Sequence, residues 1–163
     1  MTPSATQLRV RRPQAAEREA IVATITSDKT FKASEVAVAV ELIDAALAGS
    51  VDYHLLIALR HDAVVGYICF GPTPMTDATW DLYWIVVGAP FRGLGAARAL
   101  VAAMELEVAQ TGGRQVRVET SETEGYGAAR ALYARLGYPE ASMLPNFYSD
   151  GDALITYYKQ LAR

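Results

Sequence analysis

The chain has 163 residues, 52% of them hydrophobic and 20% charged, a composition that excludes a disordered chain and suits one folded domain over residues 8–163 after a flexible start at residues 1–7. The formal net charge of −3 disfavours nucleic acid as a partner, and the single cysteine, Cys69, excludes an internal disulfide and a cysteine-rich metal site, so no metal is expected. No apolar run approaches the roughly 20 residues that span a bilayer, and no signal-peptide pattern begins the chain, which predicts a cytoplasmic protein without a membrane partner.

The first half of the chain predicts one strand, two helices and a hairpin. Leu8 and Val10 alternate with polar residues, which is the strand period. Apolar residues then recur at helical spacing, with Ser34 as the N-cap of a second helix that Gly49 ends. The expected elements are a strand over 7–12, helices over 15–26 and 34–49, and strands over 53–59 and 63–70 joined by a turn at 60–62.

The second half predicts a buried central strand followed by alternating helices and strands. Residues 80–87 are almost wholly apolar, as expected for a strand with both faces covered. The expected elements are this strand, a helix over 93–110, a strand over 115–121, a helix over 127–136, and strands over 142–147 and 153–158. The order βααβββαβαββ fits one α+β domain on one mixed sheet, and an edge strand such as 153–158 would suit pairing with a second copy in a homodimer.

A glycine-bearing turn lies between the central strand and the long helix. The strand ends at Ile85, Val86 and Val87, and the turn follows as Arg92, Gly93, Leu94, Gly95, Ala96 and Ala97. Unpaired N–H groups at a helix start, the helix dipole and the absence of Cβ atoms together make an anion site, to which Arg92 adds a charge. No Lys follows Gly95, which excludes a P-loop, and Arg98 stands where the dinucleotide fingerprint needs a third small residue.

This turn resembles the Arg/Gln-x-x-Gly-x-Gly/Ala signature of the GNAT superfamily of acyl-CoA-dependent N-acetyltransferases. The segment 131–138, Ala-Leu-Tyr-Ala-Arg-Leu-Gly-Tyr, is similar to a second motif of that family, and the element order matches its fold. The resemblance implies a three-layer α/β/α arrangement around a mixed seven-stranded sheet. Two positions depart from the family: Tyr126 stands where an Asn is common, and Ala89 stands where a Pro is common.

The resemblance also implies a site for acetyl-CoA as co-substrate. The central strand would splay from its neighbour just after 85–87, and the pantetheine arm would bond to main-chain groups of Ile85 and Val87. Tyr126 would lie beside this arm, and Arg130 would lie near the adenosine phosphates. Tyr133 would give a proton to the departing thiol as the amine attacks directly through a tetrahedral intermediate.

The acceptor side carries no motif, so its residues are assigned by position. Glu119 is the first candidate to accept the proton of the amine, ahead of Asp81, Tyr83 and Glu35, and a chain of water molecules is an alternative. The expected pocket side chains are Tyr83, Trp84, Phe147 and Tyr148. The acceptor amine can be a small molecule, a peptide N-terminus or a lysine, and a second hypothesis is a non-catalytic acyl-CoA sensor of the same fold.

Overall fold

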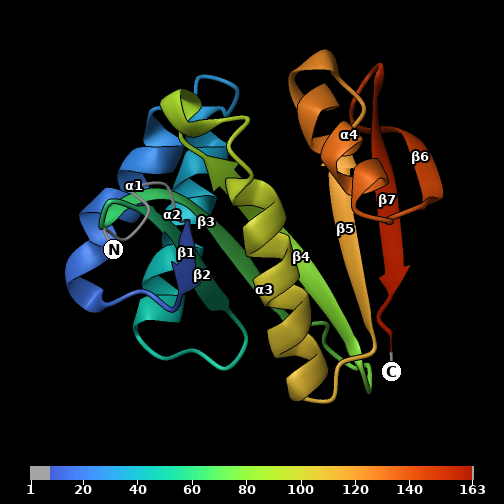
Figure 1. The fold of residues 1–163 in the computed structure, drawn as a ribbon. Coiled ribbons are helices and arrows are strands. Elements are labelled where there is room, and N and C mark those ends of the chain that lie inside the picture. Colours follow the sequence, from blue (N-terminus) through green and yellow to red (C-terminus); the bar gives the residue numbers. More distant parts are fainter. Residues whose placement is uncertain (1–7, 163) are drawn as a thin grey trace.

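The structure is a computed structural model that describes residues 8–162, and it has the element order that the sequence predicts (Figure 1). The expected flexible start, residues 1–7, lies outside the described residues. The helices are η1 (Ala15–Glu17), α1 (Arg18–Thr26), α2 (Ala33–Leu47), η2 (Ala89–Phe91), α3 (Ala96–Gln110), η3 (Glu124–Tyr126) and α4 (Gly127–Arg135). The strands are β1 (Arg9–Arg11), β2 (His54–Arg60), β3 (Ala63–Pro72), β4 (Thr79–Val87), β5 (Gln115–Ser121), β6 (Glu140–Ser149) and β7 (Asp152–Gln160).

The seven strands form one mixed sheet in the order β1-β2-β3-β4-β5-β7-β6. Every neighbouring pair is antiparallel except β4 and β5, which are joined through α3 and run parallel. A parallel pair needs a crossover connection of this kind, because both strands start at the same edge of the sheet. The mixed seven-stranded sheet is therefore confirmed.

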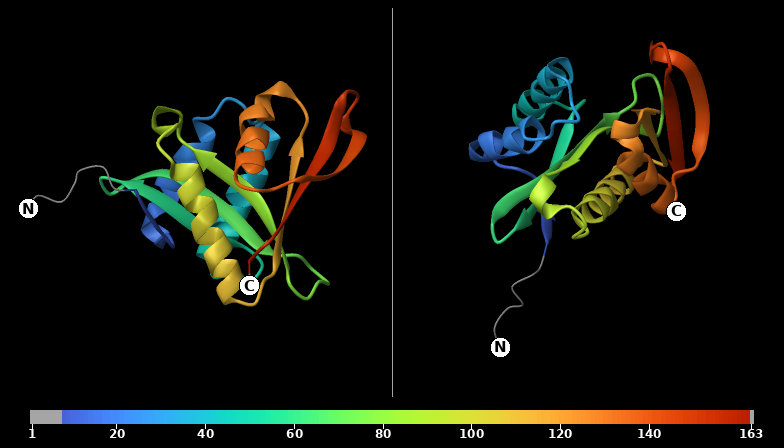
Figure 2. Two further views of the ribbon diagram at one scale, coloured as in Figure 1. Left: turned by 45° about the vertical axis from the view of Figure 1, so that its right-hand side comes forward. Right: turned by 90° about the horizontal axis from the view of Figure 1, so that it is seen from above.

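Helices cover both faces of the sheet, which confirms the three-layer arrangement (Figure 2). Ile21 of α1 and Ile43 of α2 are fully buried in a core on one face. Leu100 and Met104 of α3 lie in the core of the other face, together with Tyr133 of α4. The two halves of the sheet, β1–β4 and β5–β7–β6, diverge at the end where α4 lies (Figure 1).

Two helix starts differ from the sequence-based expectation. The long helix α3 begins at Ala96 rather than at residue 93, because Gly95 is left-handed with φ 86° and acts as its N-cap. Helix α2 begins at Ala33 with Lys32 as N-cap, so Ser34 lies inside the first turn. The carboxylate of Glu35 accepts the Lys32 N–H at 2.7 Å and so replaces the expected serine cap.

The expectation that residues 153–158 form an edge strand is also wrong. Strand β7 lies between β5 and β6, and the strands at the two edges are β1 and β6. All ten residues of β6 are exposed, whereas β7 buries Ala153, Leu154, Ile155 and Tyr157. The buried apolar residues of 153–158 are typical of an interior strand rather than of the expected edge strand. Any pairing with a second copy through this part of the sheet would therefore involve β6.

Glu105 of α3 ties its helix to the C-terminal half of the sheet. Its Oε1 accepts hydrogen bonds from the hydroxyl of Tyr138 at 2.8 Å and from Lys159 Nζ at 2.9 Å. Tyr138 is only 1% exposed, so removal of the carboxylate leaves a buried donor without a partner. We expect Glu105→Ala to lower the free energy of unfolding by about 2 kcal/mol, measured by urea denaturation.

Glu41→Ala on α2 is the matched control, because Glu41 is exposed on its helix. A substitution at such a surface position is expected to change the free energy of unfolding by less than about 0.5 kcal/mol. Equal losses in the two variants would contradict the role given to Glu105.

Candidate active site

The cleft originates where β4 separates from β5. The last residues that pair across the two strands are Leu82 and Val118. On its other side, β4 has a bulge at Tyr83, because the pairing with β3 passes directly from Trp84 to Leu82. A bulge bends a strand and can end its pairing. The splay therefore begins at Tyr83 rather than after residues 85–87, which corrects the expected position.

An ion pair fixes the point where the strands part. Arg117 Nε of β5 donates to Asp81 Oδ1 of β4 at 2.7 Å, and these two residues are register partners. The other carboxylate oxygen accepts the hydroxyl of Thr73 at 2.8 Å. Both oxygens of Asp81 are thus occupied in holding the strands together, which makes it a poorer candidate for the base than Glu119.

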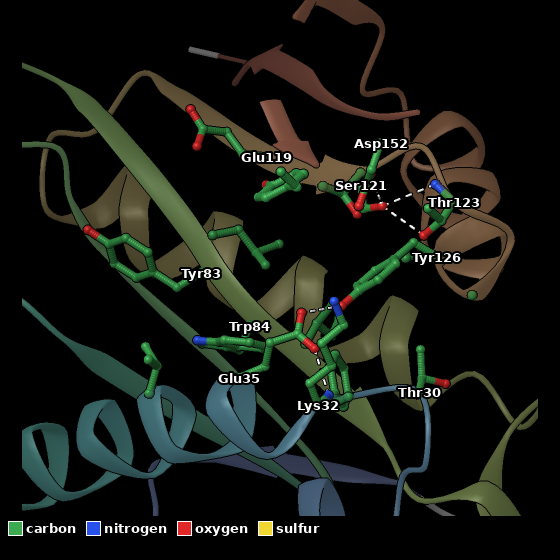
Figure 3. A pocket seen from close by; sticks show the side chains of 18 of the residues that line it. Thr30, Lys32, Glu35, Tyr83, Trp84, Glu119, Ser121, Thr123, Tyr126 and Asp152 are labelled. Atoms are coloured by element: carbon green, nitrogen blue, oxygen red, sulfur yellow. Dashed lines mark hydrogen bonds between the residues drawn. The ribbon is translucent and has the colours of Figure 1, made fainter. Parts of the chain in front are cut away.

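A cavity of about 910 Å³ fills the splay and extends to helix α2 (Figure 3). Seven of the residues assigned to the site from the sequence line it, from five separate elements. They are Tyr83, Trp84 and Ile85 of β4, Glu119 of β5, Tyr126 and Tyr133 from η3 and α4, and Tyr148 of β6.

Ten assigned residues do not line the cavity: Val86, Val87, the turn residues 92–97, Arg130 and Phe147. Phe147 neighbours Tyr148 on β6 but is 56% exposed, and its ring packs edge-on against Tyr148 at 5.1 Å between centroids. Val86 is 3% exposed and packs in the core beneath α1 and α2. Apart from Arg92 and Arg130, the structure therefore brings the polar candidates together in the cavity, and it leaves the apolar side chains of Phe147 and Val86 outside.

Tyr133 is buried at the inner end of the cavity. The residue is 5% exposed and its ring packs against that of Tyr157 at 5.6 Å between centroids. Its hydroxyl makes no hydrogen bond within residues 8–162, yet it is not among their sealed polar atoms, so it faces the cavity. Burial raises the pKa of Tyr133 above its ordinary value, and nearby Tyr157 raises it further. The hydroxyl therefore keeps its proton at physiological pH and can donate it.

Glu119 is the first residue of β5 beyond the last pair with β4. Its side chain is 43% exposed and lies 3.5 Å from Arg117 Nη1. Figure 3 shows its carboxylate on the same side of the cavity as Tyr83, away from Tyr126. A partly exposed carboxylate in this place can exchange protons with solvent and contact a ligand in the cavity.

Tyr126, which replaces the common Asn, closes the cavity toward α2. Its hydroxyl donates to Glu35 Oε1 at 2.6 Å, and its ring lies edge-on to Phe31, which in turn packs against Trp84 at 5.5 Å. Burial raises the pKa of Tyr126, and the hydrogen bond to Glu35 raises it further. A contact between η3 and α2 thus spans the cleft, and it occupies the hydroxyl that was assigned to the cofactor arm.

The glycine turn before α3 is open to a ligand. Gly93 and Gly95 have φ values of 77° and 86°, and a Cβ added at either would meet no atom within 4 Å. No hydrogen bond within residues 8–162 uses the N–H groups of Gly93, Leu94 or Gly95, and no side chain caps the helix. Leu94 is 46% exposed. Free N–H groups around left-handed glycines at a helix start fit a pyrophosphate well.

Ala96 and Ala97 start the helix behind this turn. Ala96 is 2% exposed and packs in the core, so its side chain anchors the helix and leaves ligand contact to its main chain. Ala97 is half-buried and, like Gly95, adds little bulk beside the turn. The turn therefore presents its main chain, rather than side chains, to an anion.

The two arginines assigned to phosphates are both engaged within the protein. Arg92 Nη2 donates to Asp28 Oδ2 at 2.8 Å, and its Nε lies 3.3 Å from the carbonyl oxygen of Val87. Arg130 Nη1 donates to the carbonyl oxygens of Ser121 and Thr123 at 2.7 and 2.8 Å. Arg92 remains 54% exposed beside the turn, whereas Arg130 holds the loop after β5 in place.

Other nucleophiles and bases lie outside the site. Cys69 is buried, and burial raises the pKa of its thiol to about 12. His61 lies in the β2–β3 turn with φ 49°, and His54 packs against Trp80 at 5.3 Å, away from the cavity. Among residues 8–162, no helix is long and apolar enough to cross a membrane, and no cluster of His, Cys, Asp or Glu is arranged to hold a metal.

Three residues of the site, Phe31, Ser121 and Asp152, belong to no motif that the sequence shows. Phe31 lies in the loop before α2, and Ser121 ends β5, where its hydroxyl donates to Asp152 Oδ1 of β7 at 2.5 Å. Each of these residues meets partners far away in the chain. Only the sheet order and the splay bring them together.

A split mixed sheet, with free main-chain N–H groups in the turn after its central strand, is consistent with the acetyltransferase class. A family profile described as the acetyltransferase (GNAT) family matches residues 18–138. The chain belongs to this family of acetyltransferases.

Solved structures agree with this family assignment. A protein of Desulfovibrio desulfuricans, described as a GNAT-family acetyltransferase, is 35% identical, with a TM-score of 0.90 over 96% of this chain and 100% of that one. An aminoglycoside 6'-N-acetyltransferase complexed with coenzyme A is 19% identical, with a TM-score of 0.76 over 95% and 98% of the two chains. The ribosomal-protein-S18-alanine N-acetyltransferase of Escherichia coli is 18% identical, with a TM-score of 0.77 over 96% of each chain. The last two share the fold alone. No curated protein sequence matches the chain.

Proposed function

We propose that this protein transfers the acetyl group of acetyl-CoA to the nitrogen of an amine. The observation that carries the proposal is the cavity at the β4–β5 splay, which joins the hydroxyl of Tyr133 to the carboxylate of Glu119 in one space. The free N–H groups of the turn at residues 93–95 lie at the end of the same central strand. Family membership and the coenzyme A bound by a structural neighbour support a coenzyme A thioester as the acyl donor.

The donor would be held by main-chain groups. The pyrophosphate would accept hydrogen bonds from the N–H groups of Gly93, Leu94 and Gly95, helped by the dipole of α3 and by Arg92. The pantetheine arm would lie along Ile85 and Val87 of β4, where the loss of β5 as a partner leaves main-chain groups free. This arrangement places the thioester near the middle of the sheet, beside Tyr133.

The chemistry would need two proton transfers. The amine attacks the thioester carbonyl, the tetrahedral intermediate forms, and the C–S bond then breaks as the thiolate leaves. Tyr133 would donate its proton to that sulfur, which suits a hydroxyl that burial keeps protonated. Glu119, directly or through water, would accept the proton that the amine loses.

The Glu119 assignment predicts a specific pH dependence. An alkylamine with a pKa near 10 is mostly protonated at about pH 7, so a base matters most there. We expect Glu119→Gln to lower kcat/KM about 100-fold at neutral pH, with the deficit shrinking as the pH approaches about 10. The measurement is a pH profile of thiol release with a saturating donor.

Glu124→Gln is the control, because Glu124 is an exposed acid of the nearby η3 that does not line the cavity. It is expected to keep the wild-type profile. A deficit in Glu119→Gln that is equal at every pH would remove Glu119 as the base and leave the water chain.

The proposed function itself is tested by thiol release from acetyl-CoA. We expect release that depends on an added amine and saturates with both substrates. Tight binding of coenzyme A without release, for every amine, amino acid and peptide in a broad panel, would contradict catalysis and favour a sensor.

A further inference from the structure

The charged side chains that line the cavity are mostly acidic. Four carboxylates reach it from α2, β4, β5 and β7, against two cations. The carboxylates are Glu35, Asp81, Glu119 and Asp152, and the cations are Lys32 and Arg117. The cavity therefore favours a positively charged ligand over an anionic one.

The nearby cations do not neutralise the four carboxylates equally. Arg117 is committed to Asp81 at 2.7 Å and lies 3.5 Å from Glu119. Asp152 has no cation within 4 Å among residues 8–162, and its recorded partner is the hydroxyl of Ser121 at 2.5 Å. Figure 3 shows Asp152 and Glu35 on opposite walls of the cavity, with Tyr126 between them. One carboxylate of the acceptor side is therefore left for a ligand cation.

The hydroxyl of Tyr148, on β6, lies in the negative electrostatic potential of these carboxylates. Burial raises the pKa of its hydroxyl, and the carboxylates of Glu119, Asp152 and Glu35 raise it further, with no cation acting against them. Tyr148 and Tyr126 also line the cavity with aromatic rings, whose faces attract ammonium groups. Carboxylates combined with aromatic faces are the chemistry that recognises alkylammonium ions.

A second observation points to a ligand in this space. Tyr133 is 95% buried, its hydroxyl has no hydrogen-bond partner within residues 8–162, and it faces the cavity. Buried polar groups are almost always paired, so this hydroxyl lacks a partner that a ligand supplies. The four carboxylates that line the cavity therefore belong to a binding site rather than to a solvated surface.

We propose that the acceptor is a flexible small amine that carries a second positive charge, a diamine or polyamine, whose distal ammonium group binds Asp152. This inference rests on the proposed function, since it names the class of acceptor for the same site. The reacting nitrogen then lies on the Glu119 side of the cavity, and the chain between the two nitrogens runs past the rings of Tyr148 and Tyr126.

The test compares three ligands of matched chain length on the complex of the protein with coenzyme A, where no transfer occurs. Putrescine has a distal ammonium, butylamine a distal methyl group, and γ-aminobutyrate a distal carboxylate. By calorimetry we expect putrescine to bind about tenfold more tightly than butylamine, as for a hydrogen bond to a charged group, and γ-aminobutyrate to bind most weakly. The preference should shrink as salt concentration rises.

Asp152→Asn keeps an oxygen for Ser121 and removes only the charge, so it should bring putrescine binding to the level of butylamine while butylamine binding stays unchanged. Asp150→Asn, an exposed acid in the same turn, should keep the wild-type preference. Equal binding of putrescine and butylamine to the wild type, or an undiminished preference in Asp152→Asn, would overturn the inference. Thiol release is measured separately, so a protein that prefers putrescine but releases no thiol would refute the proposed function alone.

Discussion

Replacing Tyr133 with Phe is expected to lower kcat by at least about 100-fold, because the leaving thiolate then lacks the positioned proton donor. The KM for acetyl-CoA should stay near its wild-type value, since the hydroxyl is an internal group of the cavity and the proposed pyrophosphate site is the turn at residues 93–95. The ring and its contact with Tyr157 remain in the variant, so the fold should persist. Steady-state thiol release with a saturating amine measures both quantities.

The neighbouring Tyr157 supplies the matched control. It is also buried, at 6% exposed, but it does not line the cavity. Tyr157→Phe therefore removes the same atom from the same cluster and should leave kcat within about twofold, as for a substitution outside the transition-state contacts. If both variants lose activity equally, the effect comes from packing, and Tyr133 is not the acid.

The glycine turn gives the second large effect. Gly95→Ala is expected to raise the KM for acetyl-CoA at least about tenfold, because a Cβ would project where the phosphate oxygens approach the main chain. In the free protein this Cβ would meet no atom within 4 Å, so only the strain of φ 86° should lower stability. That strain is about 1–2 kcal/mol for an L-residue in the left-handed region.

Gly112, just beyond the other end of α3, supplies the control that distinguishes the effect of backbone strain on stability from the effect on donor binding. Its φ is 88° and an added Cβ would again meet nothing within 4 Å. Gly112→Ala should therefore lose as much stability as Gly95→Ala, measured by thermal unfolding, but leave the KM unchanged. A raised KM in both variants, or in neither, would remove the turn at residues 93–95 from donor binding.

The sequence predicts the local parts of this protein well. The order of elements follows from the spacing of apolar residues and from the turn-forming residues between them. Both signals depend on residues that are only a few positions apart in the chain. The glycine turn is equally local, because Gly93 and Gly95 are needed for their own backbone conformation. Its role as an anion site could be argued from six consecutive residues.

The parts that depend on long-range pairing could not be predicted in the same way. The apolar run of β7 indicates burial but not which strands flank it, so the edge was assigned wrongly. The splay begins at Tyr83 because the register against β3 shifts there, and register is a property of two strands. The contact of Glu35 with Tyr126 across the cleft and that of Ser121 with Asp152 between β5 and β7 are likewise not predictable until the sheet is assembled.

Family membership and site geometry also differ in what they determine. The fold places the chain among the acetyltransferases, and the proposed donor, a coenzyme A thioester, rests on that membership and on the turn. The proposed acceptor contacts include cavity residues of α2, β6 and β7, which lie outside both motifs. The charge of those residues is therefore the best guide to the amine.

The most direct measurement of the central claim is mass spectrometry of the products after the wild-type protein acts on acetyl-CoA with a pooled set of amines that includes putrescine. We expect an N-acetylated amine and free coenzyme A in equal amounts, and neither product above background with the Tyr133→Phe variant over the same period. Bound coenzyme A with no acetylated amine and no free thiol would contradict the assignment of this chain as an acetyltransferase of amines.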